Sequence, residues 1–255
     1  MAFTYFWNQF HLYRHKITLT VLTVILLAGS YNAVAQNNNS LNKPGYDDKR
    51  FHYGFYLALP LTKYSITHSQ AYADQLNGAA AGEATAVNPI VNPGFYTGLV
   101  LKIRLADYLD FRFVPGVGFY NRQVEFTNMS QDGGEPADVV KSINSTMIEL
   151  PLLLKYKSMR RSNTRMYLVA GIKPGIDMGS GKSDEEADKG LATEKYDLAV
   201  EYGVGLDMFY PFFKFAPELR FSHGLLNQHK PTGSEYSGLI QKQTNHNVSL
   251  IFFFE

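Results

Sequence analysis

An all-β fold, an antiparallel up-and-down barrel that crosses a membrane, is predicted by three features of this 255-residue chain. Apolar and polar side chains alternate along about eight segments of strand length, so each segment has one apolar face. Aromatic residues make up 14% of the chain, which is typical of the aromatic girdles of membrane barrels. The connections between segments are alternately long and short, as in an up-and-down barrel with long external loops.

The N-terminal residues predict export from the cytoplasm. A basic stretch at 14–16 precedes an apolar run at 17–29, and the small-x-small sequence at 33–35 matches a signal-peptidase site. The run is too short for a transmembrane helix, which needs about 20 residues. The sequence therefore predicts three parts, which are a signal peptide at 1–35, a periplasmic lead-in at 36–50 and a single barrel domain at 51–255.

Alternation with a period of two is kept along each predicted strand. In the first strand, at 51–67, the odd positions from Phe51 to Leu59 are apolar, whereas the even positions are small, polar or aromatic. The clearest alternation is at 196–206, where apolar and aromatic residues oppose acids and glycines. Each segment reaches the roughly 9–11 residues that a tilted membrane-spanning strand requires.

The order of the connections predicts how the barrel is oriented. Short turns lie on the periplasmic side of such barrels and long loops lie outside. Long connections follow the odd strands here and short ones follow the even strands, so both termini are predicted to be periplasmic in an outer-membrane protein. The predicted external loops are 70–93, 128–141, 177–191 and 227–238, and the short turns include 107–108 and 158–163.

Charged residues on the polar faces predict an ion-pair network inside the barrel. The interior of an eight-stranded barrel is just wide enough to be filled by side chains. Charges buried there need partners, because an unpaired buried charge is costly. Inward acids and bases are nearly balanced, with Asp207 as a further inward acid. The residues predicted to form this network are Arg104, Asp110, Arg112, Glu149, Lys155, Arg165, Lys173, Asp197, Glu201, Lys214, Glu218 and Arg220.

Glycines and prolines on these strands carry predictions of their own. Inward glycines leave room for the long charged side chains. A proline cannot donate a ladder hydrogen bond, so prolines are predicted to mark bulges or strand ends. Those prolines are Pro60, Pro115, Pro151, Pro174 and Pro217.

Composition excludes several classes of function. A net charge of +1, with 18% charged residues, gives no field that would attract nucleic acid. The basic residues at 155–161 are interpreted as a solvated turn. The absence of cysteine excludes disulfides, thiolate catalysis and cysteine-based zinc sites. No cofactor and no small-molecule substrate is expected.

Candidate catalytic residues do not form a recognisable arrangement. His68 and Ser69 are adjacent, so they cannot orient each other as base and nucleophile without a contorted turn. His223, His229 and Ser234 are the other candidates near the loops, and no Gly-x-Ser-x-Gly sequence is present. The sequence therefore predicts a protein that is not an enzyme.

Metal ligands are not predicted either. His223, His229 and His246 lack the short spacing of metal ligands. The acids at 184–188 are interpreted as a solvated run rather than as a Ca²⁺ loop.

Four stretches of the sequence carry a family resemblance. They are KPGYDDKRFHYGF at 43–55, IELPLLLKY at 148–156, GIKPG at 171–175 and the final Phe254-Glu255. These stretches resemble the PorT family of outer-membrane barrels from Bacteroidetes, also called SprT. The resemblance covers essentially the whole predicted mature chain. The stretch at 148–156 is common to the wider family, whereas the lead-in is more particular to PorT, and a terminal glutamate replaces the usual terminal aromatic residue.

The resemblance implies a component of the type IX secretion system, required for protein export and, in gliding motility, for delivery of adhesins. It supplies no catalytic residues. Because the predicted lumen is filled, an accessory or assembly role is expected rather than a conduit. The expected partners are outer-membrane lipid and other type IX secretion components. The alternative is a structural or adhesive surface barrel with ligand-binding loops, and the sequence leaves partner, cargo and oligomeric state open.

Overall fold

The computed structural model describes most of the chain beyond residue 40. The predicted signal peptide at 1–35 lies outside the described residues. Within the described part, no helix is long and apolar enough to cross a membrane. The described residues are 41–78, 85–129, 137–179, 191–232 and 234–255.

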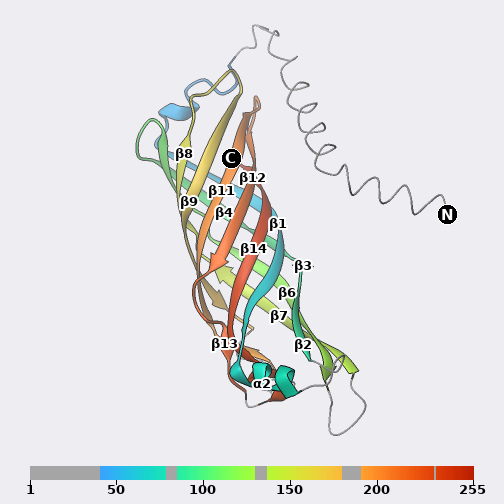
Figure 1. Ribbon diagram of the computed structural model, residues 1–255. Helices are drawn as coiled ribbons and strands as arrows, with labels where there is room; N and C mark the ends of the chain where they lie inside the picture. Colours follow the sequence, from blue (N-terminus) through green and yellow to red (C-terminus); the bar gives the residue numbers. More distant parts are fainter. Residues whose placement is uncertain (1–40, 79–84, 130–136, 180–190, 233) are drawn as a thin grey trace, which may run out of the picture. The chain divides into compact units, whose positions relative to one another are not determined.

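Eight antiparallel strands close into a ring, which confirms the predicted fold class (Figure 1). The last strand pairs with the first, with Phe55 opposite Phe254 and Thr67 opposite Lys242. In the order of pairing the ring contains β1 (Phe51–His68), β4 (Phe95–Arg104), β5 (Leu109–Phe113), β8 (Leu152–Lys157), β9 (Thr164–Asp177), β11 (Tyr196–Phe209), β12 (Lys214–Gly224) and β14 (Ile240–Phe254). Toward the long loops, β6 (Gly116–Met129) continues the line of β5, and β7 (Ala137–Glu149) leads into β8.

Prolines behave in two ways in these strands. Pro115 separates β5 from β6 and Pro151 separates β7 from β8, which confirms that these two prolines mark strand ends. Beyond the breaks β6 pairs with β4, and β7 pairs with β6 and β9, so the ring keeps eight strands. Pro60, Pro174 and Pro217 instead lie inside continuous strands, so the prediction was wrong for them. A proline carbonyl still accepts a ladder bond, as from the N–H of Gly94 to the oxygen of Pro60 at 2.8 Å.

The two ends of the barrel differ in their connections. Three short turns, at 105–108, 158–163 and 210–213, lie at one end, which we call the turn end. Glu255 and the first residues of β1 lie at this end too (Figure 1). The opposite end, which carries the long connections, is called the loop end. The halves of the barrel next to these ends are called the turn half and the loop half.

The loop end contains more regular structure than the sequence predicts. Residues 137–146 belong to strand β7, although the sequence predicts a loop at 128–141 that includes the first five of them. Their outward positions are polar, such as Ser142 and Asn144, with the exception of Val140, so the usual membrane-strand pattern is weak there. The remaining elements are α2 (Gln70–Gly78), β2 (Ala86–Ile90), β3 (Asn92–Pro93), β10 (Ala192–Thr193), β13 (His229–Lys230) and α4 (Glu235–Gly238).

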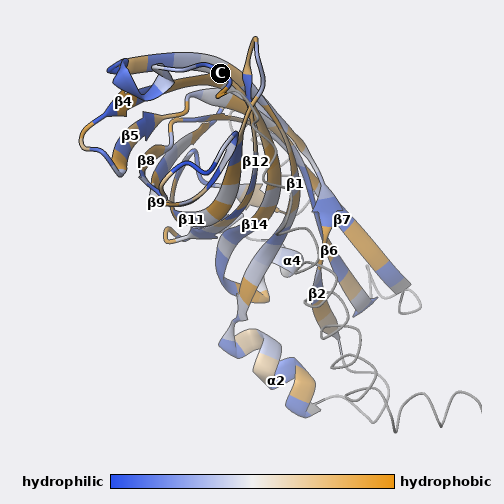
Figure 2. Ribbon diagram, turned by 90° about the horizontal axis from the view of Figure 1, so that it is seen from above, coloured by the Kyte–Doolittle hydropathy of each residue, from blue (hydrophilic) through white to orange (hydrophobic). Residues whose placement is uncertain are grey.

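The polarity of the alternation reverses along the barrel. In the turn half, apolar side chains point outward, as Leu61 and Phe119 do with about half of their surface exposed. Nearer the loops many outward positions become polar, and on β1 and β6 the inward positions become apolar, whereas the inward positions of β14 are the buried amides Gln243, Asn245 and Asn247. On β6 the outward residue after Phe119 is Asn121, while Val124 and Phe126 point inward and are fully buried. Blue and orange segments alternate along the strands in Figure 2.

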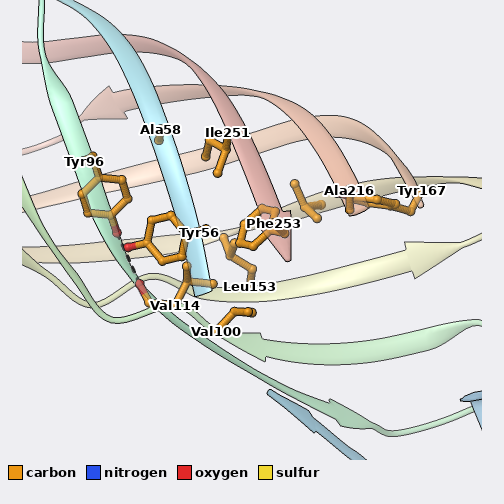
Figure 3. Packing of buried hydrophobic residues seen from close by; sticks show 11 residues of the cluster. Tyr56, Ala58, Tyr96, Val100, Val114, Leu153, Tyr167, Ala216, Ile251 and Phe253 are labelled. Carbon is orange, nitrogen blue, oxygen red and sulfur yellow. Dashed lines mark hydrogen bonds between the residues drawn. The ribbon is translucent and has the colours of Figure 1, made fainter. Parts of the chain in front are cut away.

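Apolar side chains are buried at two levels of the interior. The cluster in the turn half is mixed with charged groups and includes Tyr56, Leu153 and Phe253 (Figure 3). The cluster in the loop half is joined by Tyr236 and Ile240 from the last long connection and the start of β14. The barrel therefore has a filled interior at both levels.

Two inward glycines are required by the close approach of tyrosine rings. A Cβ atom on Gly116 would overlap the hydroxyl of Tyr56, and one on Gly205 would overlap the ring of Tyr167. These glycines let bulky side chains cross the narrow lumen.

Candidate functional site: the barrel lumen

Asp207 is the centre of the ion pairs near the turn end. Its carboxylate accepts hydrogen bonds from Lys155 Nζ at 2.8 Å and from Arg165 Nε at 2.8 Å. Lys214 Nζ lies 3.4 Å from the same carboxylate. All four side chains are almost completely buried. One acid thus holds three cations that come from β8, β9 and β12.

Glu255 supplies a second buried acid, which the sequence did not predict as a member of the network. Its carboxylate lies 2.6 Å from Lys214 Nζ, 3.1 Å from Lys102 Nζ and 3.6 Å from Arg112 Nη2. The inward and outward alternation of β14 could have predicted this position, because Phe253 points inward and Phe254 outward. Continuing that alternation by one residue places Glu255 inside the barrel.

Arg112 and Glu218 form the middle of the lumen. Arg112 Nη1 donates to Glu218 Oε2 at 2.8 Å, and the Tyr167 hydroxyl donates to the same oxygen at 2.9 Å. Arg220 Nε donates to the other carboxylate oxygen at 2.7 Å. The Arg112 guanidinium also lies 4.5 Å from the ring centre of Phe253, within the range of a cation–π contact.

Lys173 joins two acids closer to the loop half. Its Nζ lies 3.0 Å from Glu149 Oε1 and 3.4 Å from Glu201 Oε1. Glu201 also pairs with Arg220 at 3.2 Å, and Glu149 accepts from the Tyr120 hydroxyl at 3.0 Å. Each acid therefore meets at least one donor that is itself buried.

The interpretation of the basic residues at 155–161 as a solvated turn is wrong for Lys155 and Lys157, which are buried. Lys157 Nζ donates to Asp110 at 2.7 Å inside the barrel, and Lys155 is bound to Asp207. Both lysines precede the turn at 158–163 and point inward in the alternation of β8. Of this basic stretch, Arg161 is exposed to solvent.

Two of the predicted network residues have different partners. Arg104 is about 30% exposed and pairs with Asp107 in the first short turn, because it lies at the last position of β4. Asp197 is buried but accepts hydrogen bonds from two amides, Gln228 Nε2 at 3.2 Å and Asn245 Nδ2 at 2.7 Å. Asp197 lies at the loop end of β11, where the interior is less charged.

The described part of the lead-in closes the turn end of the barrel. The Tyr46 hydroxyl donates to Glu255 Oε2 at 2.8 Å. The backbone carbonyl of Tyr46 lies 2.8 Å from His52 Nε2. Arg165 Nη1 donates to Asp47 at 2.7 Å. Asn42 bonds across to Asn163 and Phe209. We call residues 42–47 the latch, because they connect three strand ends.

The charges around the latch shift two of its pKa values. Burial alone would raise the pKa of Asp47, but Arg165 and Lys157 outweigh it and hold that pKa below its usual value. Burial and the Glu255 carboxylate raise the pKa of the Tyr46 hydroxyl. Both groups therefore keep the protonation state in which they bond to the barrel at neutral pH.

The interior of the loop half contains an apolar cluster beside buried polar side chains such as Gln243 and Asn247. Phe126 and Tyr236 pack edge to face with ring centres 5.0 Å apart. Val124 and Leu239 are buried in the same cluster. Arg122 is the buried cation between the two halves, and its Nε donates to the Thr62 hydroxyl at 3.0 Å.

Residues 34–230 match the family model described as outer membrane protein beta-barrel domain. The chain belongs to this family. The protein is therefore an outer-membrane β-barrel, and the outward apolar side chains of its turn half contact membrane lipid. A comparison with curated proteins gives no match.

Solved outer-membrane barrels resemble this one only distantly. OprG from Pseudomonas aeruginosa is 16% identical, with 79% of this chain and 93% of that chain covered and a TM-score of 0.39. Neisserial surface protein A is 10% identical, with 80% and 98% covered and a TM-score of 0.35. Ail, the attachment invasion locus protein of Yersinia pestis, is 8% identical, with 81% and 98% covered and a TM-score of 0.34. Identities this low do not transfer a function.

The first pair of candidate catalytic residues serves the packing of this outer-membrane barrel. His68 stacks on Tyr72 with ring centres 4.2 Å apart, and its Nε2 lies 3.4 Å from the carbonyl of Val87. The Ser69 hydroxyl donates to the carbonyl of Gly238 at 2.6 Å. Neither side chain is directed at the other by any of these bonds.

The remaining candidates are separated in the same way. His229 Nε2 lies 3.3 Å from the hydroxyl of Ser237, a serine that the sequence did not single out, and both residues are buried. Ser234 instead caps α4 by accepting from the Ser237 N–H. His223 pairs with His246 on the outward face.

Within the described ranges, no group of three or more potential metal ligands is assembled. The acids at 184–188 lie outside the described residues.

Proposed function

We propose that this barrel is an accessory or assembly component of type IX protein secretion, and neither the conduit nor an enzyme. Two facts support the proposal. The stretches at 43–55 and 148–156 resemble the PorT family, and charged side chains that pair with one another occupy the lumen. A role in secretion must therefore be carried out by surfaces of the barrel.

The filled lumen is the observation that argues against a conduit. Arg112, Lys155 and Asp207 come from different strands and have no exposed surface. Moving any one of them aside would leave its partners as unpaired buried charges, at a cost of about 3–5 kcal/mol for a broken pair. An eight-stranded ring has no spare width for a polypeptide in addition to these side chains.

The orientation we propose places the turn end, with the latch, in the periplasm and the loop end outside the cell, following the usual arrangement of short turns and long loops. The signal peptide at 1–35 and lead-in at 36–50 are proposed on the same basis. Secretion partners would then meet the loop end from outside or the latch from the periplasm.

The docking hypothesis concerns the segments 37–49, 70–93, 128–141, 177–191 and 227–238. Deletion of each segment, followed by measurement of an exported reporter enzyme, tests it. Point changes are needed as well, because the last segment contributes Tyr236 to the buried cluster. Leu76→Asp on α2 and Leu226→Asp, immediately before the last segment, are suitable, since both leucines are over 40% exposed.

A strain without this barrel should lose export of the reporter enzyme, and the wild-type gene should restore it. If every variant that still inserts remains fully active, the docking hypothesis fails. If the deletion strain exports normally, the secretion role itself is wrong.

A surface barrel with adhesive loops is the second candidate. The described loop end supports it, because β2, β6 and β7 continue beyond the outward apolar side chains and are held by their own buried cluster. Loss of cell or ligand binding on deletion of the barrel, with normal reporter export, would favour this function over secretion.

A further inference from the structure

The first residues of β1 extend past the end of β14 and leave a short edge of the barrel with a neighbouring strand on one side only. β14 ends at Phe254, which is the register partner of Phe55. β1 begins four residues before Phe55, at Phe51, and is paired with β4 from there. No described strand pairs with residues 51–54 on the side of β14. We call this segment, which lies at the turn end, the free edge.

The backbone groups of Phe51 and Tyr53 point toward the open side of the free edge. The N–H of Arg104 donates to the carbonyl of Arg50 at 2.9 Å, so the backbone of Arg50 is directed at β4. In an antiparallel ladder this direction alternates from one residue to the next, so Phe51 and Tyr53 are directed away from β4. The free edge therefore presents two N–H and two C=O groups to an added strand.

A pocket of about 400 Å³ lies beside the free edge. Its walls include Phe51, His52 and Tyr53 from β1, and Pro44 and Tyr46 from the latch. Phe51, Tyr53 and Pro44 are exposed, so the walls offer apolar surface next to the backbone groups of the edge. The volume lies within the range of about 300–1,000 Å³ that is usual for ligand sites.

Lys43 and Lys49 supply positive charge to the wall of this pocket. Glu255 is the acid among the lining residues, and Lys102 and Lys214 already pair with its carboxylate. Lys43 Nζ donates to the main-chain oxygen of Glu255 at 3.4 Å. Burial and the charge of Lys214 lower the pKa of Lys43, and the Glu255 carboxylate only partly offsets them. A further carboxylate in the pocket would therefore be attracted by both lysines of the wall.

The whole turn end carries a surplus of positive charge. Its described residues at 41–50, 102–112, 155–165 and 207–214, together with Glu255, include twelve lysines and arginines and six aspartates and glutamates. The net charge of the chain is only +1, so the rest of the chain is acidic on balance. A surface with such a surplus attracts acidic partners and repels basic ones.

We propose that the free edge and its pocket bind an extended acidic segment of a periplasmic protein, which adds a strand beside β1 and places its carboxylates near Lys43 and Lys49. In strand addition, main-chain hydrogen bonds give affinity and pockets for alternate side chains give specificity. A lipid headgroup would use the two lysines but not the alternating donors and acceptors of the edge. The inference rests on the proposed secretion role and orientation, and it names the chemistry of the partner that meets the turn end.

The first experiment titrates the purified full chain, in a non-ionic detergent, into a fluorescein-labelled octapeptide of alternating glutamate and valine and follows fluorescence anisotropy. The double variant Lys43→Gln, Lys49→Gln should bind at least about tenfold more weakly, because it loses its charge-assisted contacts with the peptide. Replacing glutamate by glutamine in the peptide should weaken binding to the wild type in the same way. The double variant Lys63→Gln, Lys242→Gln removes the same charge from exposed positions nearer the loops, and as the matched control it should bind as the wild type does.

The second experiment tests the edge itself. Tyr53→Pro removes an N–H that points away from β4, so the ladder of the barrel stays intact while an added strand loses a hydrogen-bond donor. Tyr53→Thr removes the ring but keeps the N–H, and it is the matched control. We expect Tyr53→Pro to bind the glutamate peptide several-fold more weakly than Tyr53→Thr does. Correct folding of each variant is verified by its heat-dependent shift in gel mobility.

Three results would overturn the proposal. Equal binding of the glutamate and glutamine peptides, or unchanged binding by the Lys43→Gln, Lys49→Gln variant, would exclude an acidic partner. Equal binding by Tyr53→Pro and Tyr53→Thr would exclude strand addition. Loss of peptide binding in nanodiscs of phosphatidylglycerol, but not in those of phosphatidylcholine, would assign the pocket to a lipid headgroup instead. None of these results bears on the secretion role itself, because the strain without the barrel tests that role by export of the reporter enzyme.

Discussion

The turn half and the loop half of this barrel differ in which side chains point outward and in which interactions hold the interior together. In the turn half, outward residues such as Leu61 are apolar, and the interior is held by ion pairs around Asp207 and Glu218. In the loop half, outward residues such as Asn121 are polar, and the interior is held by the cluster around Phe126. Long strands such as β1 and β14 run through both halves, so we expect the surroundings of the barrel, rather than the strand, to set the chemistry of the interior.

The physical reason lies in what surrounds each half. Where lipid surrounds the barrel, moving an apolar side chain from the outer face to the interior gains no hydrophobic free energy, because lipid is as apolar as the interior. Paired charges can then fill the lumen, provided that every charge has a partner. Once the outward face meets water, burial of apolar surface becomes favourable again, at about 25 cal/mol per Å². The reversal on β6 between Phe119 and Val124 is expected to mark the level at which the bilayer ends.

The largest expected loss of stability comes from removing the charge of Asp207, at the centre of the ion pairs in the turn half. Asp207→Asn keeps the size of the side chain but leaves Lys155, Arg165 and Lys214 without a shared anion. We expect the free energy of unfolding to fall by about 3–5 kcal/mol. Urea titration of the barrel in lipid vesicles measures it, and Asp48→Asn, an exposed acid, is the control. A loss below about 1 kcal/mol would mean that the ion pairs do not hold this half.

Opening the apolar cluster of the loop half should lower the free energy of unfolding less than Asp207→Asn does, and only locally. Phe126→Ala removes a fully buried ring that packs on Tyr236, and we expect a loss of about 3 kcal/mol. Hydrogen exchange should speed up in β6 and in α4 while the β11 ladder stays protected. Thr127→Ala, at the next position, is the control. Faster exchange throughout the barrel would show that the halves are not separate units.

Glu255 tests whether the end of the sequence belongs to the network. Glu255→Gln keeps the shape of the side chain but removes the charge shared by Lys102, Lys214 and Arg112. We expect a loss of about 1–3 kcal/mol in urea titration. Glu125→Gln on the polar outward face should change stability by no more than about 0.5 kcal/mol. Equal effects of the two changes would contradict the role of Glu255.

The smallest effect is expected at the latch. Asp47→Asn weakens a partly exposed pair with Arg165, worth at most about 1 kcal/mol. Trypsin should cut faster after Lys49 in this variant, while Asp48→Asn leaves the rate unchanged. The pKa of Asp47 is lowered in the fold, so the bond is present above the unfolded pKa and is lost as pH falls through the lower folded value. Insensitivity of the cutting rate to Asp47→Asn would show that Asp47 does not hold the latch.

Much of the barrel could be predicted from the sequence, because a membrane strand imposes a period of two. That period identified the eight strands and the inward positions of Arg112, Glu149 and Glu218. It could not identify partners, since these depend on register and stagger between strands. Asp197 was therefore grouped with cations, although it bonds to amides. The first residues of β7 were missed because most of their outward side chains are polar, which resembles a loop when only lipid-facing strands are expected.

The reversal of polarity is tested most directly by single cysteines along β6, because the chain contains no cysteine of its own. A membrane-impermeant maleimide is applied to the barrel in lipid vesicles. We expect labelling at Asn121, Gln123 and Glu125, and none at Phe119 or at the inward Val124. Labelling of Phe119 and Asn121 at equal rates, or of Val124 as fast as Gln123, would contradict the account.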